Sequence, residues 1–244
     1  MRFVDSHLHL GGAGAPQAVA LASTSDILLL TCGVDRETSL AGLGLARGSD
    51  SVRAFVGVHP SEVLKEPDFG WLKGALEGAS GVGEVGLDPK YSPISEGSPQ
   101  RRAFRAQLEA AKQSGKPVQV HSRDAAAECI DEVSGSGVRG VLFHWFQDEA
   151  RLSRVQGSGY YVSFGPSLVY SKRLQRMAAG CSRGLVLTET DSPVTFGPLG
   201  GVSGPSLVPT VIFKLAEVWK VPFEEAAWTV SENARSYLGS SEKG

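Results

Sequence analysis

The sequence predicts a (β/α)8 barrel, the TIM-barrel fold of the α/β class, and three observations lead to this expectation. The chain of 244 residues has the length of one large α/β domain. It contains eight short apolar runs that are typical of parallel strands covered on both faces. Helix-like segments separate several of these runs, a pattern that favours strand-helix-strand units. Because no linker or internal repeat interrupts the pattern, we expect residues 1–244 to form a single domain.

Each predicted element follows from a local pattern. The eight strands are expected at Phe3–His9, Ile27–Thr31, Val52–Val58, Gly81–Leu87, Pro117–Ser122, Gly140–His144, Tyr160–Phe164 and Leu185–Thr190. The clearest helix begins with Ser98 as N-cap and Pro99 in its first turn, and it ends at Gly115. Weaker helical patterns cover Asp124–Val133, Glu149–Val155, Ser171–Ala178, Val208–Trp219 and Phe223–Leu238. The glycine-rich loop Gly11–Gly14 has no accompanying phosphate-binding pattern.

Composition sets outer limits on function. A hydrophobic content of 41% and a charged content of 20% are typical of a soluble globular protein. The apolar runs are too short to cross a bilayer, and no secretory pattern follows Arg2, so we expect a cytoplasmic protein without a membrane partner. A net charge of −2 argues against a broad nucleic acid-binding surface but leaves a local basic cleft open. No obligate protein partner is indicated.

The three cysteines indicate neither a disulfide framework nor a thiolate metal site. Cys32, Cys129 and Cys181 are odd in number, widely spaced and without a Cys-x-x-Cys pattern. We expect them to be small buried side chains.

All five histidines lie at or just after the C-terminal end of a predicted strand. They are His7, His9, His59, His121 and His144. Side chains alternate along a strand, so the imidazoles of His7 and His9 would share one face with Asp5, while Val4 and Leu8 would face the other way. Active sites of (β/α)8 barrels lie at the C-terminal ends of the strands. Because imidazole nitrogen is a preferred ligand of Zn-type ions, the pattern predicts a metal site.

Two carboxylates complete the candidate site. Glu84 lies within Val82–Asp88, where flanking glycines would leave room for a ligand and no neighbouring basic residue neutralises the acid. The alternative for Glu84 is a structural ion pair inside the barrel. Asp191 ends the last predicted strand and is followed by Ser192-Pro193. The alternative for Asp191 is an N-cap for the segment that follows.

Five motifs along the chain resemble, in order, those of the TatD family of metal-dependent hydrolases in the amidohydrolase superfamily. They are Asp5-Ser6-His7-Leu8-His9, Gly57-Val58-His59-Pro60, Gly83-Glu84-Val85-Gly86-Leu87-Asp88, His121-Ser122-Arg123 and Glu189-Thr190-Asp191-Ser192-Pro193. The closing segment with Glu232-Asn233-Ala234 is also similar to that family. The resemblance runs from the first strand to the last helix, and it implies the barrel fold predicted above.

The resemblance also implies a site for two divalent metal ions. One ion would be held by His7, His9, Glu84 and Asp191, and Glu84 would bridge to a second ion held also by His121 and His144. His59 in that family faces the substrate. Carboxylates combined with neutral imidazoles suit Zn, Mn or Mg.

A site of this kind favours phosphoryl chemistry. Two metal ions lower the pKa of a water and stabilise both the attacking and the leaving oxygen of an in-line displacement. Asp191 is the candidate general base. His59 and Arg123 are expected to contact phosphate oxygens, Arg123 through its planar donor fork. The alternative for Arg123 is a structural ion pair with Asp124 or Glu128.

The resemblance implies a phosphodiesterase that trims DNA from an end, and Tyr91 and Trp145 would then stack bases or simply pack. Two departures concern the substrate. The sixth-strand motif reads His144-Trp145-Phe146-Gln147, where the family more often has a small Ser-Gly pair after the aromatic residue. Residues 197–205 lack the Arg or Lys and the Asn that the family usually carries ahead of a proline. Hydrolysis of a small phosphodiester, ester, amide or lactone is an alternative, as is a non-catalytic binding barrel. Many members of the amidohydrolase superfamily that hydrolyse such small substrates have a bridging carbamylated lysine. The fourth strand here carries Glu84, which favours the TatD-like branch of that superfamily.

Overall fold

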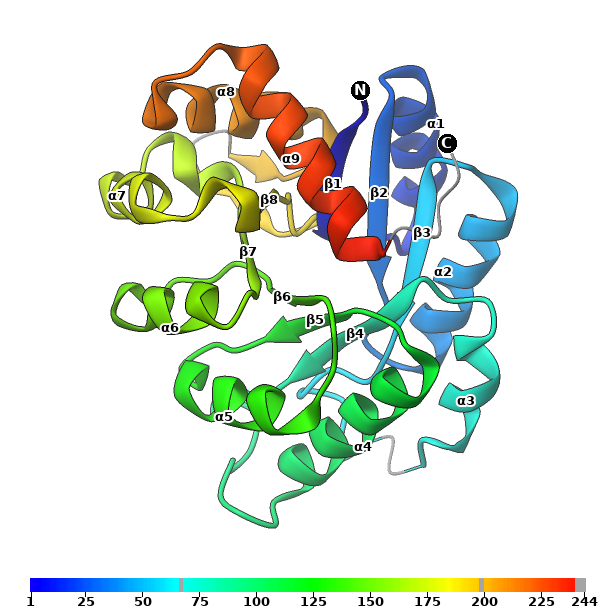
Figure 1. The fold of residues 1–244 in the computed structure, drawn as a ribbon. Helices are drawn as coiled ribbons and strands as arrows, with labels where there is room; N and C mark the ends of the chain where they lie inside the picture. The colour runs from blue at the N-terminus through cyan, green and yellow to red at the C-terminus, as the bar shows by residue number, and fades with distance from the viewer. Residues whose placement is uncertain (66–67, 198–199, 240–244) are drawn as a thin grey trace.

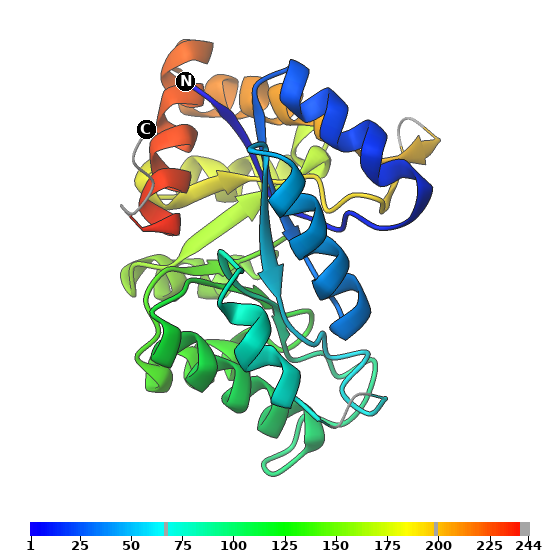
Figure 2. The same cartoon turned by 90° about the vertical axis from the view of Figure 1, so that its right-hand side faces the viewer.

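The computed structural model describes residues 1–65, 68–197 and 200–239, and it has the predicted (β/α)8 barrel architecture (Figures 1 and 2). Eight parallel strands form one sheet in the order β1 to β8. They are β1 (Phe3–Leu8), β2 (Ile27–Cys32), β3 (Val52–Val56), β4 (Gly81–Gly86), β5 (Val118–His121), β6 (Val141–Phe143), β7 (Tyr161–Phe164) and β8 (Val186–Thr188). Each lies within two residues of its predicted bounds.

Helices surround the sheet on its outer side (Figure 2). They are α1 (Ala15–Thr24), α2 (Arg36–Gly48), α3 (Gly70–Leu76), α4 (Pro99–Ser114), α5 (Ala126–Ser136), α6 (Leu152–Gly157), α7 (Lys172–Gly180), α8 (Val208–Trp219) and α9 (Phe223–Leu238). The start of α4 is as predicted, because the Ser98 side chain accepts a hydrogen bond from the N–H of Arg101. At its end Gly115 adopts the left-handed conformation with φ of 67°.

The helical pattern does not predict the first three helices. In α1 the buried residues are Ala15 and Ala22, and in α2 they are Ser39, Gly42 and Leu43. Small buried side chains leave no apolar stripe for the periodicity to reveal, so tertiary packing defines these helices. A short antiparallel pair, β9 (Thr195–Phe196) and β10 (Gly201–Val202), follows β8 and was likewise not expected.

The inside of the barrel is filled at the N-terminal end of its strands. One buried cluster contains Val4, Leu28, Leu30, Cys32, Phe55, Leu142, Tyr161, Leu187, Ala234 and Tyr237. The last two belong to α9, and the Tyr237 hydroxyl donates a hydrogen bond of 2.8 Å to the carbonyl of Val118, the first residue of β5. The α9 helix therefore closes this end of the barrel, and the polar residues gather at the opposite end.

The sheet closes into a barrel between β8 and β1. The Asp191 N–H donates to the carbonyl of His7 at 2.9 Å, and the His9 N–H donates to the carbonyl of Ser192 at 2.7 Å. These bonds join the two segments that carry candidate ligands, so closure of the barrel also fixes their relative positions.

The expected alternation along β1 is interrupted. The pairing of β1 with β2 shifts register between Asp5 and Leu8, and Val4 and Leu8 consequently pack in different apolar clusters. Asp5 does not join the histidines, because its carboxylate accepts hydrogen bonds from the backbone N–H and the hydroxyl of Thr190. The expectation that Asp5 faces the same way as the two histidines is therefore wrong. The irregularity in the strand separates their side chains.

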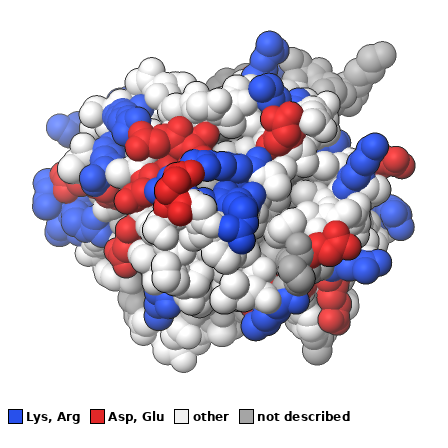
Figure 3. Space-filling view, turned by 90° about the horizontal axis from the view of Figure 1, so that it is seen from below, with Lys and Arg blue, Asp and Glu red and all other residues white. Residues whose placement is uncertain are grey.

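Among the described residues, no helix is both long enough and apolar enough to span a membrane. Cys32, Cys129 and Cys181 are all free and buried, as predicted. On the face shown in Figure 3, Lys and Arg side chains are intermixed with Asp and Glu side chains, so this face carries no broad basic surface.

Candidate metal centre

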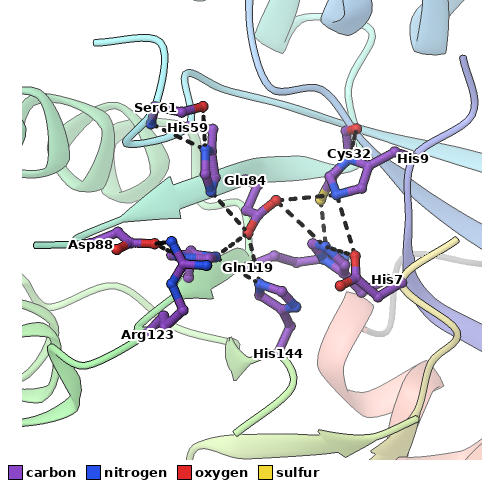
Figure 4. Close-up of polar contacts among 12 residues, drawn as sticks. His7, His9, Cys32, His59, Ser61, Glu84, Asp88, Gln119, Arg123 and His144 are labelled. Carbon is purple, nitrogen blue, oxygen red and sulfur yellow. Dashed lines mark hydrogen bonds and ion pairs between the residues drawn. The ribbon is translucent and has the colours of Figure 1, made fainter. Parts of the chain in front are cut away.

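Glu84 lies at the centre of the candidate site and presents one carboxylate oxygen to each of two histidine pairs (Figure 4). Its Oε2 is 3.6 Å from His7 Nε2 and 3.3 Å from His9 Nε2. Its Oε1 is 2.7 Å from both His121 Nδ1 and His144 Nε2. These side chains come from β1, β4, β5 and β6 or from the residue directly after the strand, and the carboxylate joins them into one group. His7, Glu84 and His144 are buried, and His9 and His121 are partly exposed.

Asp191 completes the half of the site that contains the β1 histidines. Its Oδ1 lies 3.6 Å from His7 Nε2 and 3.5 Å from His9 Nε2. The residue follows β8 in the left-handed backbone conformation, with φ of 48°. Aspartate adopts this conformation more often than most non-glycine residues, and here the conformation accompanies the turn that directs the Asp191 carboxylate at the two histidines. We call these six residues the histidine–carboxylate cluster: His7, His9, Glu84, His121, His144 and Asp191.

The cluster fits a metal ion. His7 Nε2 is buried and lacks a hydrogen-bond partner, although its ring lies among carboxylates. Distances of 3.3–3.6 Å from the β1 histidines to Glu84 and Asp191 are too long for hydrogen bonds. They lie at or slightly above the separation of roughly 3.0–3.4 Å between two ligands that are each about 2.1 Å from one ion. The two nitrogens and the Glu84 carboxylate are also close enough to form one ligand group.

The far nitrogens of the β1 histidines are held by acceptors. His7 Nδ1 lies 2.6 Å from Gln119 Oε1, and His9 Nδ1 lies 3.0 Å from the carbonyl of Cys32. The Cys32 thiol also donates to Gln119 Oε1 at 3.0 Å, which fixes the orientation of the amide. Because each Nδ1 must donate, the neutral ring of each histidine presents the lone pair of Nε2 to the centre.

In the second histidine pair, His121 and His144, the ring nitrogen that points away from Glu84 has a carboxylate near it. His121 Nε2 lies 2.8 Å from Asp88 Oδ2, and His144 Nδ1 lies 3.7 Å from Glu189 Oε2. Glu189 is fully buried and also accepts a hydrogen bond of 2.8 Å from the hydroxyl of Ser163 on β7. The hydrogen bond with Asp88 orients the His121 ring so that its Nδ1 faces Glu84 and is available to a metal. His144 Nδ1 has no hydrogen-bond partner, and Glu189 acts on it only as a nearby charge.

His59 differs from the other four histidines. The N–H of Ser61 donates to His59 Nδ1 at 3.2 Å, so this nitrogen is an acceptor and Nε2 carries the hydrogen. Nε2 lies 3.6 Å from Glu84 Oε1 and therefore points into the site. Burial lowers the pKa of His59 to about 4, which keeps the ring neutral at neutral pH. His59 is thus placed to donate a hydrogen bond from Nε2.

The remaining charges of the cluster support one another. Burial disfavours a charge on Glu84, but His144 and the other histidines hold its pKa well below the usual range. Burial also opposes a charge on His9, yet the carboxylates of Asp191 and Glu84 raise its pKa to about 10. The pKa of His144 is raised against the effect of burial by Glu84 and Glu189. Without a metal ion, the cluster therefore balances its carboxylates with protons on histidines.

Arg123 lies at the rim and has a different partner from the two that the sequence suggests. Its Nη2 is 2.6 Å from Asp88 Oδ2, and its guanidinium lies over the ring of Tyr91 at 5.3 Å. Asp88 is 35 residues away in the chain and carries the same oxygen that faces His121. The alternative given for Arg123, an ion pair with Asp124 or Glu128, is therefore wrong in its partner, which is Asp88.

A cavity of about 930 Å³ opens above the cluster. His9, His59, Glu84, His121, His144 and Asp191 form its floor, and Arg123, Tyr91 and Trp145 are among the residues that line it. All eight sequence-predicted site residues therefore lie in or directly beneath one region, with His7 buried under the floor.

The glycines beside Glu84 serve a purpose that the sequence does not reveal. A Cβ on Gly83 would lie 2.9 Å from Gln119 Cβ, and one on Gly86 would lie 1.9 Å from the carbonyl oxygen of His121. The glycines make room for β5, and the expectation that they leave space for a ligand is wrong. They allow β4 and β5 to approach closely enough for Glu84 to reach His121.

Sequence analysis missed Asp88, Gln119 and Glu189 as neighbours of the histidines. A weak signal exists for Gln119, because it is a polar residue between Val118 and Val120 in an apolar strand. Asp88 and Glu189 each lie within a recognised motif, but neither pattern shows which histidine the carboxylate contacts.

The fold and the cluster together indicate a class of protein. A (β/α)8 barrel with histidines and carboxylates gathered at the C-terminal ends of its strands is the architecture of a metal-dependent hydrolase. Residues 4–239 match the family model described as TatD related DNase, so the chain belongs to that family.

Individual relatives agree with this assignment. The protein named metal-dependent hydrolase YabD from Bacillus subtilis (strain 168) is 28% identical, over 95% of this chain and 96% of that protein. Deoxyribonuclease TATDN3 from Homo sapiens is 29% identical, over 73% of this chain and 71% of that protein. The crystal structure of YJJV, a TatD homolog from Escherichia coli k12, shares the fold with a TM-score of 0.86 at 23% identity, over 97% of both chains.

Proposed function

We propose that this chain is a phosphodiesterase that requires two divalent metal ions and removes nucleotides from the end of a DNA strand. The observation that carries the proposal is the position of Glu84, which directs Oε2 at His7 and His9 and Oε1 at His121 and His144. A carboxylate between two sets of nitrogen ligands suits a bridging ligand. In the proposed site, His7, His9 and Asp191 hold one ion with Glu84, and His121 and His144 hold the other.

In the proposed mechanism, the protein side chains hold the metal ions, accept a proton from water and position the phosphate. When bound, divalent metal ions lower the pKa of water and offset the charge that develops on a phosphate. Asp191 accepts a proton from the attacking water, because its Oδ1 faces the histidines and Oδ2 is left to act as a base. The neighbouring His9, His7 and His144 hold the pKa of Asp191 below its usual value despite burial, so its carboxylate is ionised at neutral pH.

His59 and Arg123 position the phosphate. His59 presents a neutral Nε2–H toward Glu84, so it donates to a phosphate oxygen without competing for the metal. Arg123 keeps part of its guanidinium exposed at the rim, with the side chain 40% accessible, and provides a fork for a second oxygen. The two donors approach from β3 and β5, on either side of the strand that carries Glu84.

The family match and the name of the human relative support a nuclease over other hydrolases. The same cluster would also activate water for attack on a carbonyl carbon, so substrate choice depends on the walls of the cavity.

The experiment uses the full chain after chelation and dialysis, then after addition of Mn²⁺, Zn²⁺ or Mg²⁺. Hydrolysis of bis-p-nitrophenyl phosphate and of single-stranded oligonucleotides is measured beside a panel of lactones and N-acyl compounds. We expect phosphodiester hydrolysis that disappears with the metal and returns with it. Turnover of a lactone or an N-acyl compound with no phosphodiester turnover would contradict the proposal.

A further inference from the structure

The walls of the cavity carry little positive charge. Among the described residues that line it, Arg123 is the only Lys or Arg. Acidic side chains line the same walls, namely Asp124, Asp148 and Glu149. Since nucleic acid phosphates are held chiefly by Lys and Arg, these walls offer few contacts to a chain of phosphates.

Arg123 itself is partly neutralised. Its Nη2 lies 2.6 Å from Asp88 Oδ2, and Asp88 is fully buried and therefore a fixed counter-charge. The guanidinium retains its exposed side and its contact over Tyr91. It can contact one phosphate near the cluster, but it does not create an extended basic surface.

Two segments that supply proposed metal ligands also lack basic residues. Residues 3–35, which include β1 and the loop after it, contain no Lys or Arg, and neither do residues 184–213, which include β8 and the loop after it. These two segments supply His7, His9 and Asp191, and neither contributes a cation of its own that could follow a strand as it leaves the cavity. Single-strand binding proteins combine a basic groove with stacking aromatic residues.

The cavity has the dimensions of a small-molecule site. Its volume of about 930 Å³ lies within the range typical of such pockets. Tyr91 is 46% exposed beside Arg123 and His59, and its ring offers a face to one base or one aromatic leaving group. Among the described aromatic residues that line the cavity, Tyr91 is the exposed one, since Trp145 is half-buried and Phe146 is buried. A single phosphate at the cluster and one ring at Tyr91 would therefore use the two contacts that the cavity offers most openly.

We infer that the enzyme acts on short phosphodiesters, of about dinucleotide size, and contacts them through the reacting phosphate and one adjoining ring. This inference rests on the proposed function and narrows its substrate class. A longer strand is a substrate only through its last nucleotides, and the remainder stays in solvent without contributing to binding.

The dependence of affinity on salt concentration distinguishes contact with one phosphate from contact with a whole strand. For a single strand, the slope of log affinity against log salt concentration is about −0.7 for each phosphate contact. Raising salt from about 50 to about 200 mM would therefore weaken binding about 3-fold for one contact and about 300-fold for six. The number of phosphates that the protein engages can be read from this slope.

The experiment measures kcat/KM of the metal-loaded protein for thymidine 5′-(p-nitrophenyl phosphate) and for oligothymidylates from the dinucleotide to about 16 nucleotides. Each substrate is tested across the same salt range. We expect kcat/KM per strand end to change less than about 3-fold with length, and the salt effect to stay near 3-fold for every substrate. A rise of tenfold or more with length, or a salt effect above about 50-fold, would overturn the inference and leave the proposed function standing. Absence of hydrolysis for every phosphodiester would contradict both.

A charge-reversal pair tests the walls directly. Glu149→Lys adds a cation beside the cavity, and Glu224→Lys makes the same change in charge on α9, which covers the opposite end of the barrel. We expect Glu149→Lys to increase the salt effect on a long oligonucleotide from about 3-fold to about 7-fold, with little change for the thymidine ester. Glu224→Lys should leave both unchanged. Equal effects of the two variants would show that overall charge, and not the cavity wall, governs strand binding.

Discussion

Replacement of Glu84 by glutamine tests the bridging role of this residue. Glutamine keeps the length and shape of the side chain but has one carbonyl oxygen and one NH2 group. In the structure, Oε2 of Glu84 faces His7 and His9, and Oε1 faces His121 and His144. An amide directs its oxygen at one pair only, and the NH2 group that faces the other pair is not a metal ligand.

The expected magnitude follows from this geometry. Glu84→Gln should hold at most one metal ion per chain, where we propose two for the native protein. Both halves of the site keep their histidines in this variant, but only the half with His7 and His9 also keeps a carboxylate, that of Asp191. One ion should therefore be retained in that half. We therefore expect loss of the ion near His121 and His144, and retention of the ion near His7 and His9.

Elemental analysis after equilibration with excess metal and removal of unbound ions provides the measurement. His59→Ala is the matched control, because it alters the same part of the site, 3.6 Å from Glu84, but leaves every proposed ligand in place. Circular dichroism of both variants verifies the fold. If His59→Ala empties one position while Glu84→Gln keeps two ions, the roles assigned to these residues are reversed.

Three further predictions concern individual groups of the site. Asp191→Asn should keep at least one metal ion and the fold, but its turnover of an activated phosphodiester should fall by about two to four orders of magnitude; near-native turnover with full metal would exclude Asp191 as the base. Glu189→Gln should weaken metal binding about 10- to 100-fold, because it removes a buried negative charge 3.7 Å from His144 Nδ1, and calorimetric titration measures the change; an unchanged affinity would show that Glu189 only accepts the hydrogen bonds of Trp145 and Ser163. Metal binding near pH 7 should release at least one proton, because His9, with a pKa of about 10 in the metal-free protein, must lose its proton to become a ligand. Affinity should therefore rise with pH, and titrations in buffers of different ionisation enthalpy measure the protons released; zero release would contradict the raised pKa.

The regular elements could be predicted from the sequence where their signals are local. The boundaries of α4 follow from Ser98, Pro99 and Gly115, which act within one turn of the helix. The helices α1 and α2 lack such signals, because their buried residues are mostly Ala, Ser and Gly and their positions depend on the sheet beneath them. The strands were predictable since continuous apolar runs mark them wherever they lie.

The candidate site was predictable in its members but not in its contacts. The placement of the histidines at strand ends predicts that they converge, and the motifs add Glu84 and Asp191. The ion pair of Arg123 with Asp88 was not predictable, because two acidic residues lie much nearer in sequence. The register shift in β1, which turns Asp5 toward Thr190, likewise depends on pairing with neighbouring strands.

The central claim is that Glu84 lies between two metal ions, and anomalous X-ray scattering tests it most directly. Crystals of the full chain would be grown with Mn²⁺ or Zn²⁺, and data would be collected on either side of the absorption edge of that metal. We predict two anomalous peaks, one between Glu84 and the His7–His9 pair and one between Glu84 and the His121–His144 pair. A single peak, or a peak bound to His59 Nε2, would contradict this arrangement.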